Sequence, residues 1–145
     1  MDERKRSDLS RYRFKRANEE IAIAKDLLHS GRLLKSANSS YYAMFHAVRS
    51  VLALEGFDAK KHSTVISHFG QNYVKTGIFP SETTSMIWDA FHIRRYSDYE
   101  DYYELTPEQA QEQIDKAESI LRMIHEYLKS RWAEIEAEIE KKGEI

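Results

Sequence analysis

The chain contains no cysteine, and its 145 residues include only 5 glycines and 2 prolines. The absence of cysteine excludes disulfide bonds and thiolate nucleophiles. Because so few residues break helices, long helices are favoured. No uninterrupted apolar run has the length of a signal-peptide core or of a membrane-spanning helix. We therefore expect a cytoplasmic protein that makes no contact with a membrane.

Several chemical motifs are also missing. The glycines are isolated, so there is no glycine-rich phosphate loop, and no Gly-x-Ser-x-Gly elbow presents a serine nucleophile. These absences exclude nucleotide hydrolysis of the Walker type. The six histidines form no zinc-type ligand set, since even His62 and His68 are six residues apart rather than four. We expect neither a metal ion nor a cofactor.

The charges of the chain nearly balance overall but not locally. A formal net charge of −2 argues against non-specific duplex binding, driven by counterion release, as the main activity. The first sixteen residues nevertheless hold seven lysines or arginines against three acidic residues. This basic excess can contact RNA or an acidic partner, or it can be the solvated face of a helix.

Apolar residues recur at intervals of three and four in five segments, which predicts five helices, and no segment alternates as a strand would. The second segment, residues 34–52, is apolar on more than one face and is predicted to lie at the centre of a bundle. The fold class is therefore all-α. We expect a single domain over residues 1–145, with its core at about 8–130 and a charged helical extension over 131–145.

The last helix is predicted to be long. Its start, Thr106-Pro107-Glu108-Gln109, combines an N-cap threonine, a proline in the first turn and a glutamine that completes a capping box. The apolar face then continues for roughly 35 residues, or about 50 Å. A small bundle does not need that length. Trp132, Ile135 and Ile139 are therefore expected to face another chain or to stand free, and contact with a partner is the favoured interpretation.

Two arginines stand where the fourth helix should end. Arg94 and Arg95 follow the apolar residues Ile87 and Trp88 by seven positions, so both should project from the end of the buried stripe. Two guanidinium groups beside Asp98 and several phenols form a plausible phosphate-binding site. The alternative is structural, because Arg94 and Arg95 have the i,i+4 and i,i+3 spacings that favour ion pairs with Asp98.

Histidines and tyrosines add further candidates with two interpretations each. His62 begins the third helix and either caps it, which is favoured, or contacts a phosphate at the helix N-terminus. His46 is either a hydrogen-bonded core residue, which is favoured, or a catalytic residue. The tyrosines that follow the arginines can stack on bases or can be half-buried interface residues, and acidic residues are interleaved with them. This tyrosine-rich stretch comprises Tyr96, Tyr99, Tyr102 and Tyr103.

Four blocks of the sequence, in order, resemble the HEPN superfamily, specifically its small stand-alone prokaryotic branch. The first block is Ser36-Ala37-Asn38-Ser39-Ser40-Tyr41-Tyr42-Ala43-Met44-Phe45-His46-Ala47. The later blocks are Lys61-His62-Ser63, Tyr73-Val74-Lys75-Thr76-Gly77-Ile78-Phe79 and Arg94/Arg95 with Ser97-Asp98-Tyr99. The resemblance covers nearly the whole chain, about residues 8–130.

This resemblance implies an up-and-down helical bundle that forms homodimers. Many members of the superfamily are metal-independent RNases that act as toxins or in phage defence. They are frequently paired with an antitoxin, a small nucleotidyltransferase of the MNT type. In catalytic members an arginine is followed after four to six residues by a histidine. The arginine stabilises charge on the phosphate and the histidine moves protons. Here no histidine follows Arg95 before His125, and the expected position falls on Glu100.

The residues and the resemblance together support two hypotheses. In the first, the protein is a toxin or defence component that acts on RNA. Arg94 and Arg95 bind phosphate, Asp98 orients them or acts as a base, and Tyr99 stacks or donates a hydrogen bond. The RNA- or nucleotide-binding candidates are Asn38, Tyr42, His62 and Tyr102. Tyr102 also matches a tyrosine that the nucleotidyltransferase partner modifies with AMP in some members.

The second hypothesis is a non-catalytic module, in which the same residues bind a nucleotide or dock on a nucleotidyltransferase. The arginine–aspartate pair is then structural. A third and less favoured interpretation is a scaffold whose working surface is the long fifth helix.

Overall fold

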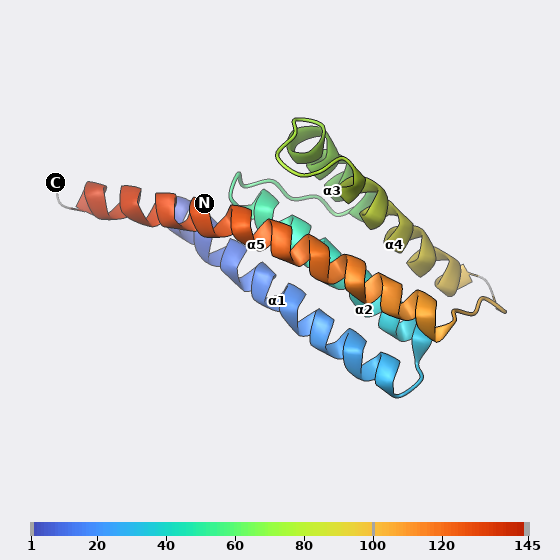
Figure 1. The fold of residues 1–145 in the computed structure, drawn as a ribbon. Helices are drawn as coiled ribbons and strands as arrows, with labels where there is room; N and C mark the ends of the chain where they lie inside the picture. Colours follow the sequence, from blue (N-terminus) through green and yellow to red (C-terminus); the bar gives the residue numbers. More distant parts are fainter. Residues whose placement is uncertain (1, 100, 144–145) are drawn as a thin grey trace.

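The computed structural model describes residues 2–99 and 101–143, except for the side chain of Tyr99. The protein is 82% helical, and the described residues form no strand. The helices are α1 (Glu3–His29), α2 (Leu33–Ala53), α3 (His62–Phe69), α4 (Glu82–Tyr99) and α5 (Pro107–Gly143). A short π-helical turn, η1 (Gly70–Val74), extends α3. The predicted all-α bundle of five helices is confirmed (Figure 1).

α2 lies at the centre of the bundle, as its two apolar faces predicted. α1 and α2 form an antiparallel hairpin, and Gly31 supplies the positive φ of 79° that the tight turn between them requires. α5 runs along both α1 and α2, while α3 and α4 pack against α2 from another side (Figure 1). Among the described residues, α1 and α4 make no contact with each other. One face of α2 therefore has no helix across it.

The start of α5 has the capping box that the sequence predicted. The backbone N–H of Gln109 donates to the Thr106 hydroxyl at 3.1 Å, and the backbone N–H of Thr106 donates to Oε1 of Gln109 at 2.9 Å. These two bonds satisfy donors that a helix start otherwise leaves without partners.

The end of α5 corrects a prediction. Trp132 and Ile135 are buried against α1 and so neither stand free nor need another chain to cover them, while Ile139 is half-buried. The Trp132 indole N–H donates to the hydroxyl of Ser10 at 2.9 Å. Near the chain ends, Lys142 lies 3.8 Å from Glu3. The apolar periodicity of α1 starts only at Phe14, whereas the helix itself starts at Glu3. Small serines in its first turns provide the surface that covers Trp132.

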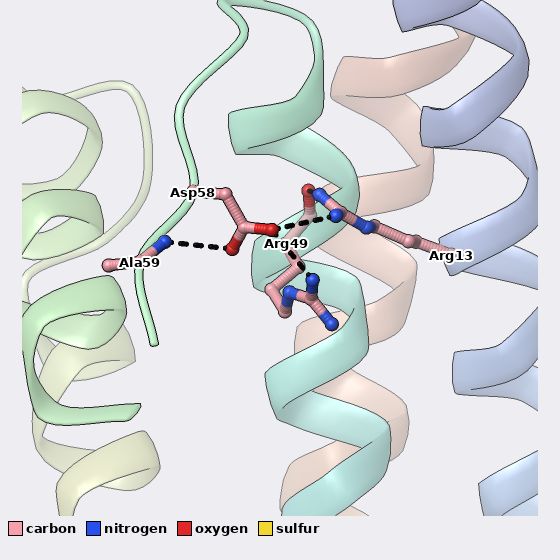
Figure 2. A network of polar contacts seen from close by, with 4 residues as sticks. All are labelled: Arg13, Arg49, Asp58 and Ala59. Atoms are coloured by element: carbon pink, nitrogen blue, oxygen red, sulfur yellow. Dashed lines mark hydrogen bonds and ion pairs between the residues drawn. The ribbon is translucent and has the colours of Figure 1, made fainter. Parts of the chain in front are cut away.

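The segment between α2 and α3 is held by one carboxylate, Asp58 (Figure 2). One oxygen of Asp58 accepts hydrogen bonds from Arg13 at 3.0 Å and from Arg49 at 2.9 Å. The other oxygen accepts the backbone N–H of Ala59 at 2.9 Å. These contacts tie the segment to α1 and α2 and thereby set where α3 begins, at His62.

Candidate functional site

The candidate site lies on the side of α2 between α1 and α4, where Asn38, Tyr42 and Arg49 are partly exposed and Phe45 and His46 are buried. We call this surface the α2 face and define it by five residues at helical spacing: Asn38, Tyr42, Phe45, His46 and Arg49. Side chains from α1 reach one edge of it, since Arg13 donates to the backbone carbonyl of Arg49. Side chains from α4 reach the other edge, since the guanidinium of Arg94 lies over Tyr42.

Arg94 is held by aromatic rings rather than by an acid. Its guanidinium carbon lies 5.2 Å from the ring centre of Tyr42 and 5.7 Å from that of Tyr41. Both distances are typical of cation–π contacts. Within the described part of the chain, no ion pair joins Arg94 or Arg95 to Asp98, so the structural ion pair considered from the sequence is not formed. Among the described residues, the Arg94 guanidinium has no hydrogen-bond or ion-pair partner, and the two rings fix its position.

The rest of the arginine segment is more exposed. Arg95 lies over the ring of Phe91 at 5.8 Å, and Asp98 is exposed. The hydroxyl of Ser97 donates to the backbone carbonyl of Arg94 at 2.7 Å and lies 3.3 Å from Oδ1 of Asn38. Asn38 thus links the end of α4 to α2.

Of two further predicted tyrosines, only Tyr102 can be placed relative to this cluster. Tyr99 ends α4, and its side chain lies outside the described residues. Tyr102 follows α4 and is 96% exposed, so it makes almost no contact with the rest of the chain.

His62 does not cap α3, which corrects the favoured interpretation. The N-cap of α3 is Lys61, and no side-chain hydrogen bond caps the helix. The imidazole of His62 instead stacks on Phe45, with 3.9 Å between ring centres, and its Nδ1 shares a hydrogen bond of 2.8 Å with the hydroxyl of Tyr41. His62 is thereby placed on the α2 face, next to the two tyrosines that support Arg94.

The surroundings of His62 and Tyr41 keep both groups neutral near pH 7. Burial lowers the pKa of His62, and the positive charges of Arg94 and Arg49 lower it further. Burial is also the main cause of a raised pKa of the Tyr41 phenol, which therefore keeps its proton. A neutral imidazole can accept a proton, and a protonated phenol can hold one of its nitrogens in place.

His46 is buried as predicted but is not fully hydrogen-bonded. It is 7% exposed, and its Nδ1 has no hydrogen-bond partner in the described structure. Burial, followed by the charges of Arg16 and Arg49, lowers its pKa to about 4. Arg13, Arg16 and Arg49 thus add positive charge near His46.

Arg13 and Arg49 are functional candidates that the sequence reading missed. Figure 2 shows both guanidinium groups directed at the single carboxylate of Asp58, so the pair retains a net positive charge. Burial alone would raise the pKa of Asp58, but hydrogen bonds from Arg49 and the Ala59 N–H bring the pKa below its usual value. Arg49 could have been found as one of only two Lys or Arg residues in the mostly apolar α2. The sequence did not mark Tyr41 as a site residue, because Tyr41 fits the apolar face of α2 that forms the core.

Replacing Asp58 by asparagine tests this network. Because the pKa of Asp58 is lowered in the folded state, its stabilisation is present above the usual value of 3.8 and is lost as the pH falls through the lowered pKa. The carboxylate is 47% exposed, so we expect Asp58→Asn to lower the free energy of unfolding by only about 1 kcal/mol at pH 7. Urea denaturation at several pH values should show this difference shrink as the pH falls below 3.8 and vanish below the lowered pKa of Asp58. The network is not the cause of the lost stability if the difference in unfolding free energy does not change with pH. The same holds if the exposed control Asp8→Asn loses as much stability.

The described residues contain no cluster of three or more His, Asp or Glu that could hold a metal ion. None of the helices in that part of the chain is both long and apolar enough to cross a membrane.

The helix order and the arginine–aromatic cluster define a small all-α domain with a candidate anion-binding face. The HEPN domain family model matches residues 10–127. The chain therefore belongs to the HEPN domain family, and the resemblance seen in the sequence is confirmed.

Several curated proteins are similar to this chain over most of its length. A UPF0332 protein of Thermotoga maritima is 34% identical over 114 residues, which cover 79% of this chain and 86% of the relative. Two proteins of Methanocaldococcus jannaschii, each named "Putative toxin", are 27% and 29% identical. Their alignments cover 80% and 78% of this chain, and 79% and 84% of the respective relatives.

Proposed function

We propose that this protein acts on RNA as the toxin-type component of a toxin–antitoxin or defence pair. The observation that carries the proposal is the placement of Arg94 over Tyr42, at 5.2 Å, beside a neutral His62 on the α2 face. A guanidinium fork binds two phosphate oxygens at once, and aromatic rings next to it can stack on bases.

The charges along the α2 face support an anionic chain rather than a single small anion. Arg94 lies at one end of the face and Arg49 at the other, and Arg13 and Arg16 of α1 add to the charge near Arg49. The described acidic groups nearby include Asp58, which is shared by two arginines, Glu20, and the exposed Asp98 four residues after Arg94. A strand of RNA would meet several cations in succession, although the whole molecule carries a net charge of −2.

The predicted site residues take different parts in this proposal. Arg94 binds the reacting phosphate and the exposed Arg95 adds a second guanidinium. Tyr42 is the stacking platform, and Asn38 fixes the end of α4 through Ser97. The exposed Asp98 and the terminal Tyr99 are proposed to contact the strand beyond the reacting phosphate.

The family and the relatives' names support the proposed partners. Two similar proteins are named as toxins, which supports pairing with an antitoxin, and we propose a nucleotidyltransferase of the MNT type in that role. A homodimer would bring two α2 faces to one RNA in the cytoplasm. With 96% of its side chain exposed, Tyr102 is accessible for AMP transfer by such a partner. In the second candidate function, the α2 face binds a nucleotide or this partner without catalysis.

The test is incubation of the purified protein with mixed RNA in EDTA. Wild type is expected to cleave, Arg94→Ala/Arg95→Ala to be inactive, and Asp98→Ala to retain most activity. Arg122→Ala, an exposed arginine of α5, is the matched control and should behave as wild type. If the folded wild-type protein binds RNA without cleaving it, the non-catalytic module replaces the RNase. If it neither binds nor cleaves RNA, action on RNA is wrong.

A further inference from the structure

Catalytic members of the family combine an arginine with a histidine that follows it on the same helix. Here α4 carries Arg94 and Arg95 but no histidine after them. The imidazole nearest to the rings that support Arg94 comes instead from α3. The ring centre of His62 lies 5.9 Å from that of Tyr41 and 6.1 Å from that of Tyr42. The guanidinium of Arg94 lies over the same two rings. Tyr41 and Tyr42 therefore each contact both Arg94 and His62, and the charge of Arg94 acts on His62.

The environment of His62 leaves one ring nitrogen available. In the tautomer whose Nδ1–H donates to the Tyr41 oxygen, Nε2 carries a free lone pair, and no hydrogen bond to Nε2 occurs within the described residues. The ring is stacked on Phe45 and is only partly exposed. An imidazole that is fixed at one nitrogen and accessible at the other has the arrangement of a proton-transfer group.

We propose that His62 is the catalytic histidine of this protein. It takes the role of the histidine that catalytic family members carry after the arginine. The proposal rests on the proposed action on RNA and assigns its proton-transfer step. Tyr41 is a positioning residue, because it touches His62 rather than the substrate.

The reaction that fits this pair is transesterification at a phosphodiester. Nε2 of His62 accepts the proton of a ribose 2′-hydroxyl while that oxygen forms a bond to phosphorus. The bond from phosphorus to the 5′-oxygen breaks, and the imidazolium returns the same proton to that oxygen. The products are a 2′,3′-cyclic phosphate and a 5′-hydroxyl, with no net gain or loss of protons or electrons. Arg94 stabilises the charge that develops on the phosphate oxygens.

Other candidate bases fit less well. Asp98 is exposed, and no described contact connects it to Tyr41 or Tyr42. His46 is 7% exposed, which leaves little surface for a substrate.

The protonation of His62 depends on the groups that face it from α2 and α4. All of them are cationic or neutral, so the proton affinity of His62 is low before RNA binds. These groups are Tyr41, Tyr42, His46, Arg49 and Arg94.

The experiment compares His62→Gln with His68→Gln. Glutamine at position 62 can still bond to the Tyr41 hydroxyl but cannot exchange a proton at neutral pH. His68 is the matched control, since it lies on the same short helix and pairs with Glu55. Rates of RNA cleavage are measured from pH 5 to 9, and affinity is measured with a 2′-O-methyl oligonucleotide, which cannot react.

We expect His62→Gln to cleave at least about 100-fold more slowly, as is typical when a general base is lost, with its affinity within about threefold of wild type. The wild-type rate should fall on acidification with a midpoint below the usual histidine value of 6.5, and this acidic limb should be missing from the residual activity of His62→Gln. His68→Gln should retain the wild-type cleavage rate and the fall of that rate on acidification.

The outcomes separate the two proposals. If wild type cleaves and His62→Gln cleaves equally well, the histidine assignment is wrong and the action on RNA stands. The assignment is also wrong if the products lack 2′,3′-cyclic ends, or if RNA is bound through Arg94 without being cleaved. If wild type neither binds nor cleaves RNA, the proposed function itself fails.

Discussion

Arg94→Ala is expected to lower the rate of RNA cleavage by about 1000-fold, because preorganised donors to a developing oxyanion are each worth about 100- to 1000-fold. The structure sets a second expectation for Arg94→Lys. Lysine keeps the positive charge but loses the planar fork and much of the stacking on Tyr42 and Tyr41. We expect this variant to bind RNA within about threefold of wild type and to cleave about 100-fold more slowly.

Single-turnover rates and the affinity for a 2′-O-methyl oligonucleotide measure the two effects separately. Arg122→Lys on α5 is the control for a generic change of arginine to lysine. Full activity of Arg94→Lys would show that only charge is required at this position. Full activity of Arg94→Ala would show that Arg94 is not part of the site.

Trp132→Ala is expected to destabilise the fold by about 3 kcal/mol, a typical cost for truncating a buried tryptophan. Trp132 is 8% exposed, stacks edge-on against Phe14, donates a hydrogen bond to Ser10 and lies under the guanidinium of Arg11 at 4.7 Å. The substitution removes all of these contacts and leaves a cavity between α1 and α5. The melting temperature should fall by about 10 °C for a chain of this size.

The same variant distinguishes intrachain packing from an interface. Urea denaturation gives the free energy, and gel filtration gives the oligomeric state, which should not change. Tyr12→Ala, which alters a 57% exposed aromatic side chain on α1, should have an effect near zero. A Trp132→Ala variant that keeps its stability but changes its oligomeric state would restore the idea that the end of α5 contacts a partner.

The features that the sequence predicted correctly are local. Helices follow from apolar residues three and four positions apart, and the capping box at Thr106 and Gln109 needs only residues within one turn. The central place of α2 followed from its two apolar faces. Each of these features depends on neighbours along the chain, so a single sequence contains the necessary information.

The features that the sequence did not predict depend on distant contacts. Spacing left open whether Arg94 pairs with Asp98 or serves a phosphate site, and it gave no sign that Arg94 lies over two tyrosines of another helix. The position of His62 depends on the path of the segment after α2. That path is fixed by Asp58, which binds an arginine 45 positions earlier. The covered end of α5 was missed because Ser7 and Ser10 carry no apolar signal.

The central claim is that RNA binds to the α2 face, with its phosphates at Arg94 and its bases beside Tyr42 and His62. The most direct measurement is an NMR titration of the labelled protein with a 2′-O-methyl oligonucleotide at low salt. The largest shifts are expected at the guanidinium of Arg94, the ring nitrogens of His62 and the backbone of α2 from residue 38 to residue 49. Shifts concentrated instead on the exposed side of α5, or no shifts at any concentration, would contradict this claim.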